Sequence, residues 1–357
     1  MDKVPKIPIF RPFLPTFDKY SEYLKSIDSN QIYSNNGPLV QELEKRFSQY
    51  LGLDPSLVVA CTNATLALQG AATTSPSEPD SKWGLPSWTF TASAAGLLNA
   101  SKNFSFLDVD EDWMAACEST IRSLMLVLPF GQSFDPKKVP ETIDCLIIDG
   151  AASFANLKDI NLQSDLPTSG VISLHATKIL PAGEGAIYFT NNLQWANKFR
   201  SWISFGMNET RESQSVGTNA KMSEYTAAVG LASLDEWSTK RAEWTQLLQK
   251  AQNIAAEFGL KGHPAMNSSM LSTYWILEFD DPEHCQELKI EFKRANIETR
   301  EWWYKGCHTM KAYSNVAYNS LDNTNRLALR TIGIPFYLGL HESYWTRLGQ
   351  IFSKISK

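Results

Sequence analysis

A serine and a lysine stand five residues apart just after a short apolar run. The run is residues 170–172, the serine is Ser173, the lysine is Lys178, and Gly183 and Gly185 follow them. A serine hydroxyl at the end of a strand can bind a phosphate, and a lysine amine that loses its proton can form a Schiff base with an aldehyde. Pyridoxal phosphate (PLP) carries both groups, so Lys178 is a candidate cofactor lysine. The same pattern also fits a surface lysine in a loop, and the hypothesis needs support from other segments.

The first support is Asp149, which ends the apolar run 145–148 and precedes small residues at 150–152. A carboxylate at the end of a buried strand is costly unless it is paired or hydrogen-bonded. In a PLP site such a carboxylate pairs with the pyridinium nitrogen, so the ring stays cationic and withdraws electrons. The alternative is an aspartate that caps the next helix.

The second support is the segment in which the β-branched run 58–59 passes through Asn63, Ala64 and Thr65 into a helical pattern. The N–H groups at the start of a helix can bind a phosphate. Thr65 adds a hydroxyl, and Asn63 can cap the helix or contact the phosphate. A capped helix without a ligand fits the same residues.

An aromatic segment, residues 86–91, offers a surface for a flat ring. The ring can stack on Phe90, or with lower preference on Trp88. A core aromatic beside a strand is the alternative.

In their order and spacing, these segments resemble the DegT/DnrJ/EryC1/StrS family of PLP-dependent sugar aminotransferases, which have fold type I. The resemblance covers nearly the whole chain. It includes five further segments, at residues 9–12, 33–40, 128–132, 217–224 and 333–337.

The resemblance implies a role for each candidate residue. Lys178 carries the cofactor as a Schiff base and later moves the proton, while Asp149 pairs with the ring nitrogen and Phe90 stacks on the ring. The phosphate is bound by the segment at Asn63, by the backbone N–H groups of Ala64 and Thr65, and by the hydroxyl of Ser173.

The resemblance also implies a homodimer with shared sites. Asn219 or Lys221 matches the part that, in this family, reaches the phosphate of the neighbouring subunit's cofactor. One departure concerns Ala152, which stands where the family usually has a Gln or His that contacts the cofactor.

The expected activity is transamination of a nucleotide-linked keto-deoxy sugar with L-glutamate as amino donor, which gives a nucleotide-amino sugar. Candidate substrate contacts are His175, inside the lysine motif, and Trp303 and Lys305, in a segment rich in cations and aromatics. Two alternatives stay open: an aminotransferase for another carbonyl such as a keto-cyclitol, and a catalytically silent relative with a regulatory role. Ala152 keeps the second alternative open, whereas an intact Lys178 argues against it.

The bulk properties exclude several classes. With 357 residues, 43% of them hydrophobic, and a net charge of −5, the chain has a large core and no basic stripe, which argues against nucleic-acid binding. No apolar run reaches the length of a membrane span. Five scattered cysteines argue against a disulfide framework and fit a reducing cytoplasm. No His/Cys spacing indicates a metal site.

The elements that must position these residues alternate between short apolar runs and helical patterns. The alternation predicts a large domain with a mostly parallel sheet between helices, over residues 9–240, and a smaller C-terminal α+β domain over residues 241–357. A long helical pattern at 223–258, interrupted near Ser238, joins them, and a strand is expected at 297–303. Ligands bind such sheets at the carboxyl ends of the strands, where the candidate residues lie.

Overall fold

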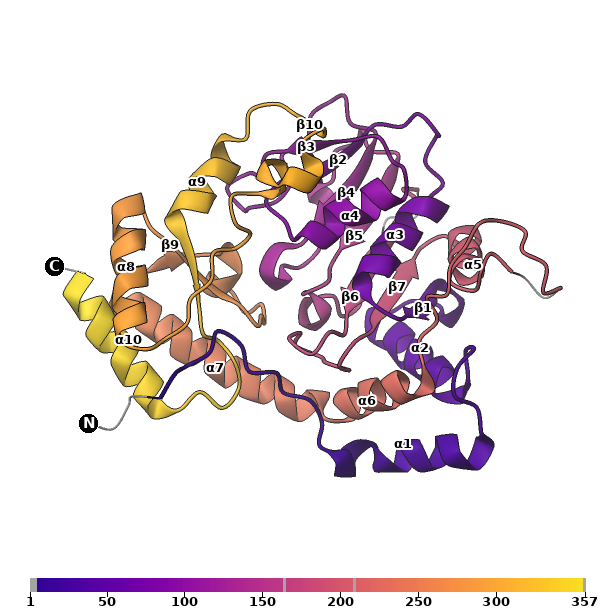
Figure 1. The fold of residues 1–357 in the computed structure, drawn as a ribbon, viewed down its shortest axis with the longest axis horizontal. Coiled ribbons are helices and arrows are strands. Elements are labelled where there is room, and N and C mark those ends of the chain that lie inside the picture. Colours follow the sequence, from indigo (N-terminus) through magenta and orange to yellow (C-terminus); the bar gives the residue numbers. More distant parts are fainter. Residues whose placement is uncertain (1–4, 163–164, 208–209, 356–357) are drawn as a thin grey trace.

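The computed structural model describes residues 5–162, 165–207 and 210–355. In this part of the chain an eight-stranded sheet has the order β1-β7-β6-β5-β4-β2-β3-β10 (Figure 1). Strand β7 is antiparallel to both of its neighbours, and the other neighbouring pairs are parallel. The strands are β1 (Val58–Cys61), β2 (Trp83–Pro86), β3 (Phe104–Leu107), β4 (Ser123–Val127), β5 (Cys145–Asp149), β6 (Thr168–Ser173), β7 (Ala186–Thr190) and β10 (Ala317–Tyr318).

Both faces of this sheet are covered by helices. In β5, Leu146 and Ile148 pack into one hydrophobic core, whereas Cys145 and Ile147 pack into the other. A strand that is buried on both faces has a continuous run of apolar residues rather than an alternation of apolar and polar residues. For this reason the apolar runs in the sequence predicted these strands. The first core is closed by α2 (Pro38–Leu51) and α6 (Glu224–Asp235), and the second by α3 (Ala64–Thr74), α4 (Thr91–Asn99) and α5 (Leu193–Trp202).

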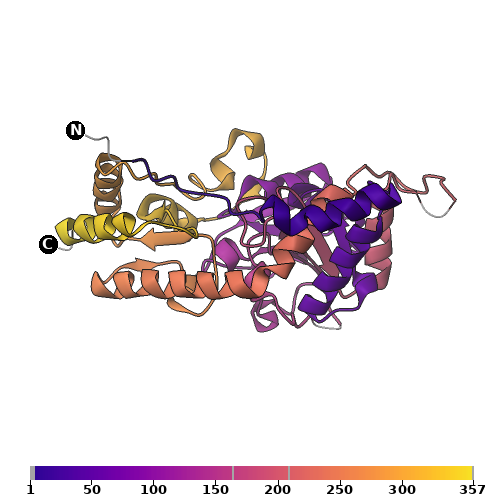
Figure 2. The same ribbon diagram turned by 90° about the horizontal axis from the view of Figure 1, so that it is seen from below.

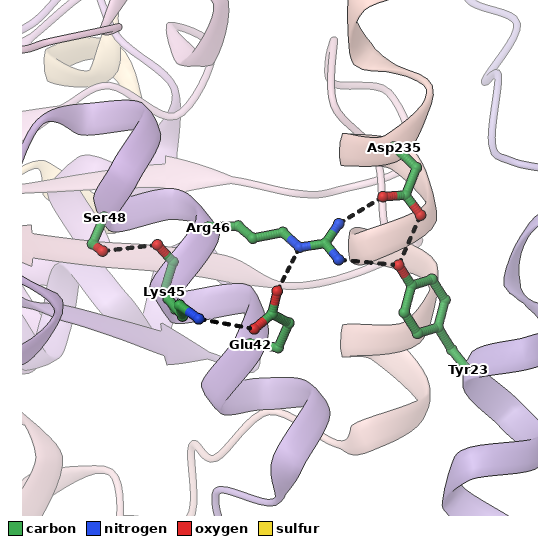
Figure 3. A network of polar contacts seen from close by, with 6 residues as sticks. All are labelled: Tyr23, Glu42, Lys45, Arg46, Ser48 and Asp235. Atoms are coloured by element: carbon green, nitrogen blue, oxygen red, sulfur yellow. Dashed lines mark hydrogen bonds and ion pairs between the residues drawn. The ribbon is translucent and has the colours of Figure 1, made fainter.

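Helix α1 (Phe17–Asn30) is mostly exposed and is attached by polar contacts. Arg46 of α2 donates to Asp235 of α6 at 2.6 Å and to Glu42 at 2.8 Å, and the hydroxyl of Tyr23 of α1 donates to Asp235 at 2.7 Å (Figure 3). Three helices thus meet at one guanidinium group.

A second sheet lies at the other end of the elongated molecule (Figure 2). It has the antiparallel order β11-β9-β8. Its elements are β8 (Lys261–Gly262), β9 (Trp275–Glu278) and β11 (Thr331–Ile334), with α8 (Pro282–Arg294), α9 (Asp322–Arg330) and α10 (Glu342–Ile355) around them.

Helix α7 (Trp237–Glu257) runs along both sheets (Figure 1). It follows α6 after a break at Glu236, close to the interruption expected near Ser238. One hydrophobic core continues from the large sheet along α7 to the second sheet, and β10 of the C-terminal part pairs with β3. The two parts therefore interleave, and the proposed division after residue 240 stays a prediction.

The strand expected at 297–303 is wrong. This segment makes only isolated bridges, from Ile297 to Ile7 and from Arg300 to Gly333, in the part of the chain that the structure describes. Residues 302–305 then form a turn.

Candidate active site

The carboxyl ends of β1, β5 and β6 open into one cavity of about 640 Å³. It brings together most of the residues that the sequence singled out. These are Asn63, Ala64, Thr65, Phe90, Asp149, Ala152, Ser173, His175, Lys178 and Trp303.

Asp149 is buried at the end of β5, with 6% of its surface exposed. Its Oδ2 accepts a hydrogen bond from the Ser93 hydroxyl at 2.6 Å, and its Oδ1 accepts one from the N–H of Ala151 at 3.1 Å. Burial raises the pKa of this carboxyl, against the two hydrogen bonds and the nearby charge of Lys178. A short 3-10 turn (Phe154–Asn156) follows after Ser153, and no helix begins at Asp149, so the capping alternative does not hold.

Lys178 lies in a loop whose two ends are joined by backbone hydrogen bonds. The N–H of Leu174 donates to the carbonyl of Gly185 at 2.9 Å, and the N–H of Ala176 donates to that of Gly183 at 2.8 Å. Gly183 has a φ of 88° and Gly185 a φ of 131°, positive values that a residue with a side chain rarely adopts. The half-buried Lys178 amine donates to the hydroxyl of Tyr274 at 3.0 Å.

Helix α3 begins at the wall of the cavity. Asn63 caps it, because its side-chain oxygen accepts from the N–H of Leu66 at 2.9 Å. The N–H groups of Ala64 and Thr65 lie in the first turn, where no carbonyl of the helix can pair with them. Together with the Ser173 hydroxyl in the same cavity, they form a donor set suited to a phosphate.

The aromatic residues at this cavity divide into two kinds. Phe90 is 57% exposed and lines the cavity, whereas Trp88 is 1% exposed and belongs to a buried cluster. Of the two rings that were considered for stacking, only Phe90 is therefore accessible to a ligand. Trp303 lies face to face with Phe130, with centroids 4.4 Å apart and planes at 4°.

Among the residues that contact or line the site, Ser93, Phe130 and Tyr274 were not foreseen. Phe130 stood within a segment used for the resemblance but had no role. Ser93 has the spacing of a helical neighbour of Thr89, whose hydroxyl lies 2.9 Å away. Tyr274 comes from the C-terminal part, and its sequence neighbourhood carries no sign of the site. Arg300 also lines the cavity, and it belongs to the segment rich in cations and aromatics that was considered for substrate contacts.

Three predicted residues lie outside this cavity. The side chain of Lys221 donates to Asn219 at 2.7 Å and lies 4.6 Å from the ring centroid of Phe205, and burial lowers its pKa. Lys305 is exposed and does not line the cavity. His175 does line it, and its Nε2 lies 3.8 Å from Glu184.

The residues of the cavity fit PLP. Asp149 is a buried carboxylate that a cation would stabilise, a lysine amine projects into the same space, and a helix start with a serine provides the phosphate donors. Within the described residues no group of three or more His, Cys, Asp or Glu side chains is placed to hold a metal ion. In the same part of the chain no helix has the length and apolar character to cross a bilayer.

A mostly parallel sheet that presents a lysine and a buried aspartate at its strand ends is the architecture of fold-type I PLP enzymes. The chain belongs to the DegT/DnrJ/EryC1/StrS aminotransferase family, whose profile matches residues 18–352. It is therefore a PLP-dependent aminotransferase. The predicted family, the fold-type I architecture with its mostly parallel sheet, the enzyme class and the cofactor are confirmed, whereas the separate smaller C-terminal domain stays a prediction.

Two curated relatives and one solved structure are similar to the chain over nearly its whole length. The dTDP-4-amino-4,6-dideoxy-D-glucose transaminase of Shigella dysenteriae is 25% identical and covers 93% of this chain and 95% of its own. The GDP-perosamine synthase of Caulobacter vibrioides is 25% identical and covers 96% of each chain. The structure of DesI in the presence of its TDP-sugar product is 25% identical, with a TM-score of 0.84, and covers 99% of this chain and 93% of its own.

Proposed function

We propose that this aminotransferase moves an amino group from L-glutamate to a nucleotide-linked keto-deoxy sugar, with Lys178 and Asp149 as its catalytic residues. The observation that carries the proposal is that Lys178, Asp149, Ser173 and the start of α3 surround a single cavity. The two relatives, a dTDP-4-amino-4,6-dideoxy-D-glucose transaminase and a GDP-perosamine synthase, support a sugar attached to dTDP or GDP as substrate.

Each residue has a task in this proposal. Bound PLP supplies an electron-withdrawing ring that stabilises negative charge at the donor's α-carbon. Asp149 holds a proton on the ring nitrogen. Burial penalises the charged form of this carboxyl and raises its pKa, and a cationic partner such as the protonated ring offsets that penalty. With the cofactor bound, Nζ of Lys178 would accept the proton that leaves the donor's α-carbon and would return it later in the reaction. Asn63, Ala64, Thr65 and Ser173 bind the phosphate, and Phe90 stacks on the ring.

We expect the sugar nucleotide to contact His175, Trp303 and Arg300, which all line the cavity. The stacked pair of Trp303 and Phe130 offers an apolar face to a deoxy sugar, and the Arg300 guanidinium offers a charge to a diphosphate. A contact between Lys305 and the part of a long substrate that extends beyond the cavity stays a prediction.

A homodimer with shared sites is part of the proposal. The segment 204–219 carries Phe205, Met207 and Val216, which are 46%, 37% and 92% exposed. Large exposed apolar side chains gathered in one segment are typical of an interface. Asn219 is the last residue of this segment and Lys221 follows two residues later, so we expect these side chains to reach the cavity of a partner subunit.

The experiment starts from borohydride reduction of the purified protein with PLP, followed by peptide mass mapping. The reduced adduct should lie on Lys178, and Lys178→Ala should lower transamination by at least about a thousandfold. Lys25→Ala, which removes an exposed lysine paired with Glu22, is the matched control. An adduct on another lysine would refute the assignment.

The substrate class is tested in the reverse direction. The protein is incubated with 2-oxoglutarate and either dTDP-4-amino-4,6-dideoxy-D-glucose or GDP-perosamine, and the glutamate formed is measured. Formation of glutamate from either compound supports the proposal. A spectrum of bound PLP that responds to no amino acid would favour the silent, regulatory alternative instead.

A further inference from the structure

Lys178 is held by a tyrosine from a distant part of the chain. Its Nζ donates a 3.0 Å hydrogen bond to the hydroxyl of Tyr274 and lies 5.5 Å from the centroid of that ring. Tyr274 stands just before β9 of the second sheet, so 96 residues separate the partners. Both side chains line the cavity.

The backbone of Tyr274 is fixed by its neighbour Ser272. The N–H of Tyr274 donates to the Ser272 hydroxyl at 3.0 Å, and that hydroxyl donates to the carbonyl of Phe130 at 2.5 Å. Ser272 is buried. The backbone of Tyr274 is therefore linked through Ser272 to Phe130, the residue on which Trp303 stacks.

The ring of Tyr274 is fixed by three aromatic neighbours. Its centroid lies 5.6 Å from that of Phe10, 5.5 Å from that of Phe130 and 5.3 Å from that of Trp302, all in edge contacts. Such contacts favour one orientation of a ring. The hydroxyl is thus held at one place, opposite an amine on a flexible four-carbon stem.

A phenol hydroxyl suits an amine that changes its protonation state. It accepts a hydrogen bond from an ammonium group and donates one to a neutral amine, so it contacts the lysine in both states. We propose that Tyr274 is a positioning residue, which holds the Lys178 amine in the cavity whenever the amine is not bonded to the cofactor. This inference rests on the proposed role of Lys178.

The matched pair of variants is Tyr274→Phe and Tyr50→Phe. The first keeps the ring contacts and removes only the hydroxyl. The second removes a tyrosine hydroxyl that donates to the carbonyl of Phe154 at 3.2 Å, outside the cavity. Crystal structures of the cofactor-free proteins should show Lys178 next to residue 274 in the wild type and Tyr50→Phe, but turned away or in several rotamers in Tyr274→Phe.

The functional readout is the exchange of the α-hydrogen of glutamate with deuterium from D₂O in the PLP-loaded protein, followed by NMR. Tyr274→Phe should slow this exchange by about 10- to 100-fold, because a small misplacement of a reacting group is costly. The KM for glutamate should stay within about twofold, since the hydroxyl acts on the lysine and not on donor binding.

Two outcomes separate this inference from the function on which it rests. If borohydride places the adduct on Lys178, but Tyr274→Phe leaves both the lysine position and the exchange rate unchanged, the inference is wrong and the proposed function stands. If the adduct of the wild type lies elsewhere, the proposed function and the inference both fail.

Discussion

The hydroxyl of Ser93 donates to Oδ2 of Asp149 at 2.6 Å, and both side chains are buried. The second carboxylate oxygen accepts from the N–H of Ala151, so each oxygen has a hydrogen-bond donor from the protein. Ser93 is within hydrogen-bond distance of Thr89 as well, at 2.9 Å. An asparagine at position 149 can keep both contacts, because its oxygen accepts from Ala151 and its amide donates to Ser93, whose own proton turns toward Thr89.

We therefore expect Asp149→Asn to abolish transamination and yet stabilise the cofactor-free protein at neutral pH, by about 1 kcal/mol, because it removes a buried charge. Since burial raises the pKa of Asp149 in the folded state, its favourable contribution is complete below the unfolded pKa and is lost as the pH rises through the folded pKa. The difference between variant and wild type should grow with pH and vanish in acid. Thermal unfolding between about pH 4 and pH 8 measures it, and a difference independent of pH would contradict the cause given.

Trp303→Ala should weaken the binding of the sugar nucleotide and leave the reaction with glutamate unchanged. The substitution removes the ring stacked on Phe130 and leaves an open cavity wall. The KM for the sugar nucleotide should rise by about 3- to 10-fold, in line with the loss of one aromatic contact. The glutamate half-reaction of the same variant serves as the internal control, and an equal loss there would place Trp303 at the cofactor instead.

Shared sites predict rescue between inactive subunits. Lys178→Ala and Lys221→Ala subunits each lack one part of a site, but a mixed dimer contains one site with both lysines intact. If subunits mix at random, about a quarter of wild-type activity should return on co-expression, because half of the dimers are mixed and each has one complete site of two. Activity that never exceeds the average of the two variants would show that each subunit carries its own site.

How far the sequence predicts this site depends on which contacts are local. Asp149 and Ser173 end apolar runs that are buried on both faces, and parallel neighbours end at the same edge, so their convergence follows from the pattern of the runs. The helix cap at Asn63, one of the two roles that the sequence allowed, is local for a similar reason, since the hydrogen bond spans three residues.

The parts that could not be predicted depend on long-range packing. Nothing around Tyr274 distinguishes it from a core tyrosine, because its role comes from a lysine 96 residues earlier. The segment 297–303 has a strand-like composition, but it makes only isolated bridges in the described part of the chain. Strand β10 consists of two exposed residues. It pairs with β3, but no apolar run in the sequence predicts it.

The first described residues of the chain and a segment near residue 300 meet at the same wall. Ile7 bridges Ile297, the N–H of Ile9 donates to Glu298 at 2.9 Å, and Phe10 contacts the rings of Tyr274 and Trp302. During synthesis, Phe10 leaves the ribosome long before its partners exist. Strands β1 to β7 of the large sheet can form meanwhile, but the pocket stays open on this side until Trp302 has emerged, so a nascent chain should acquire most of its large sheet well before it can retain its cofactor.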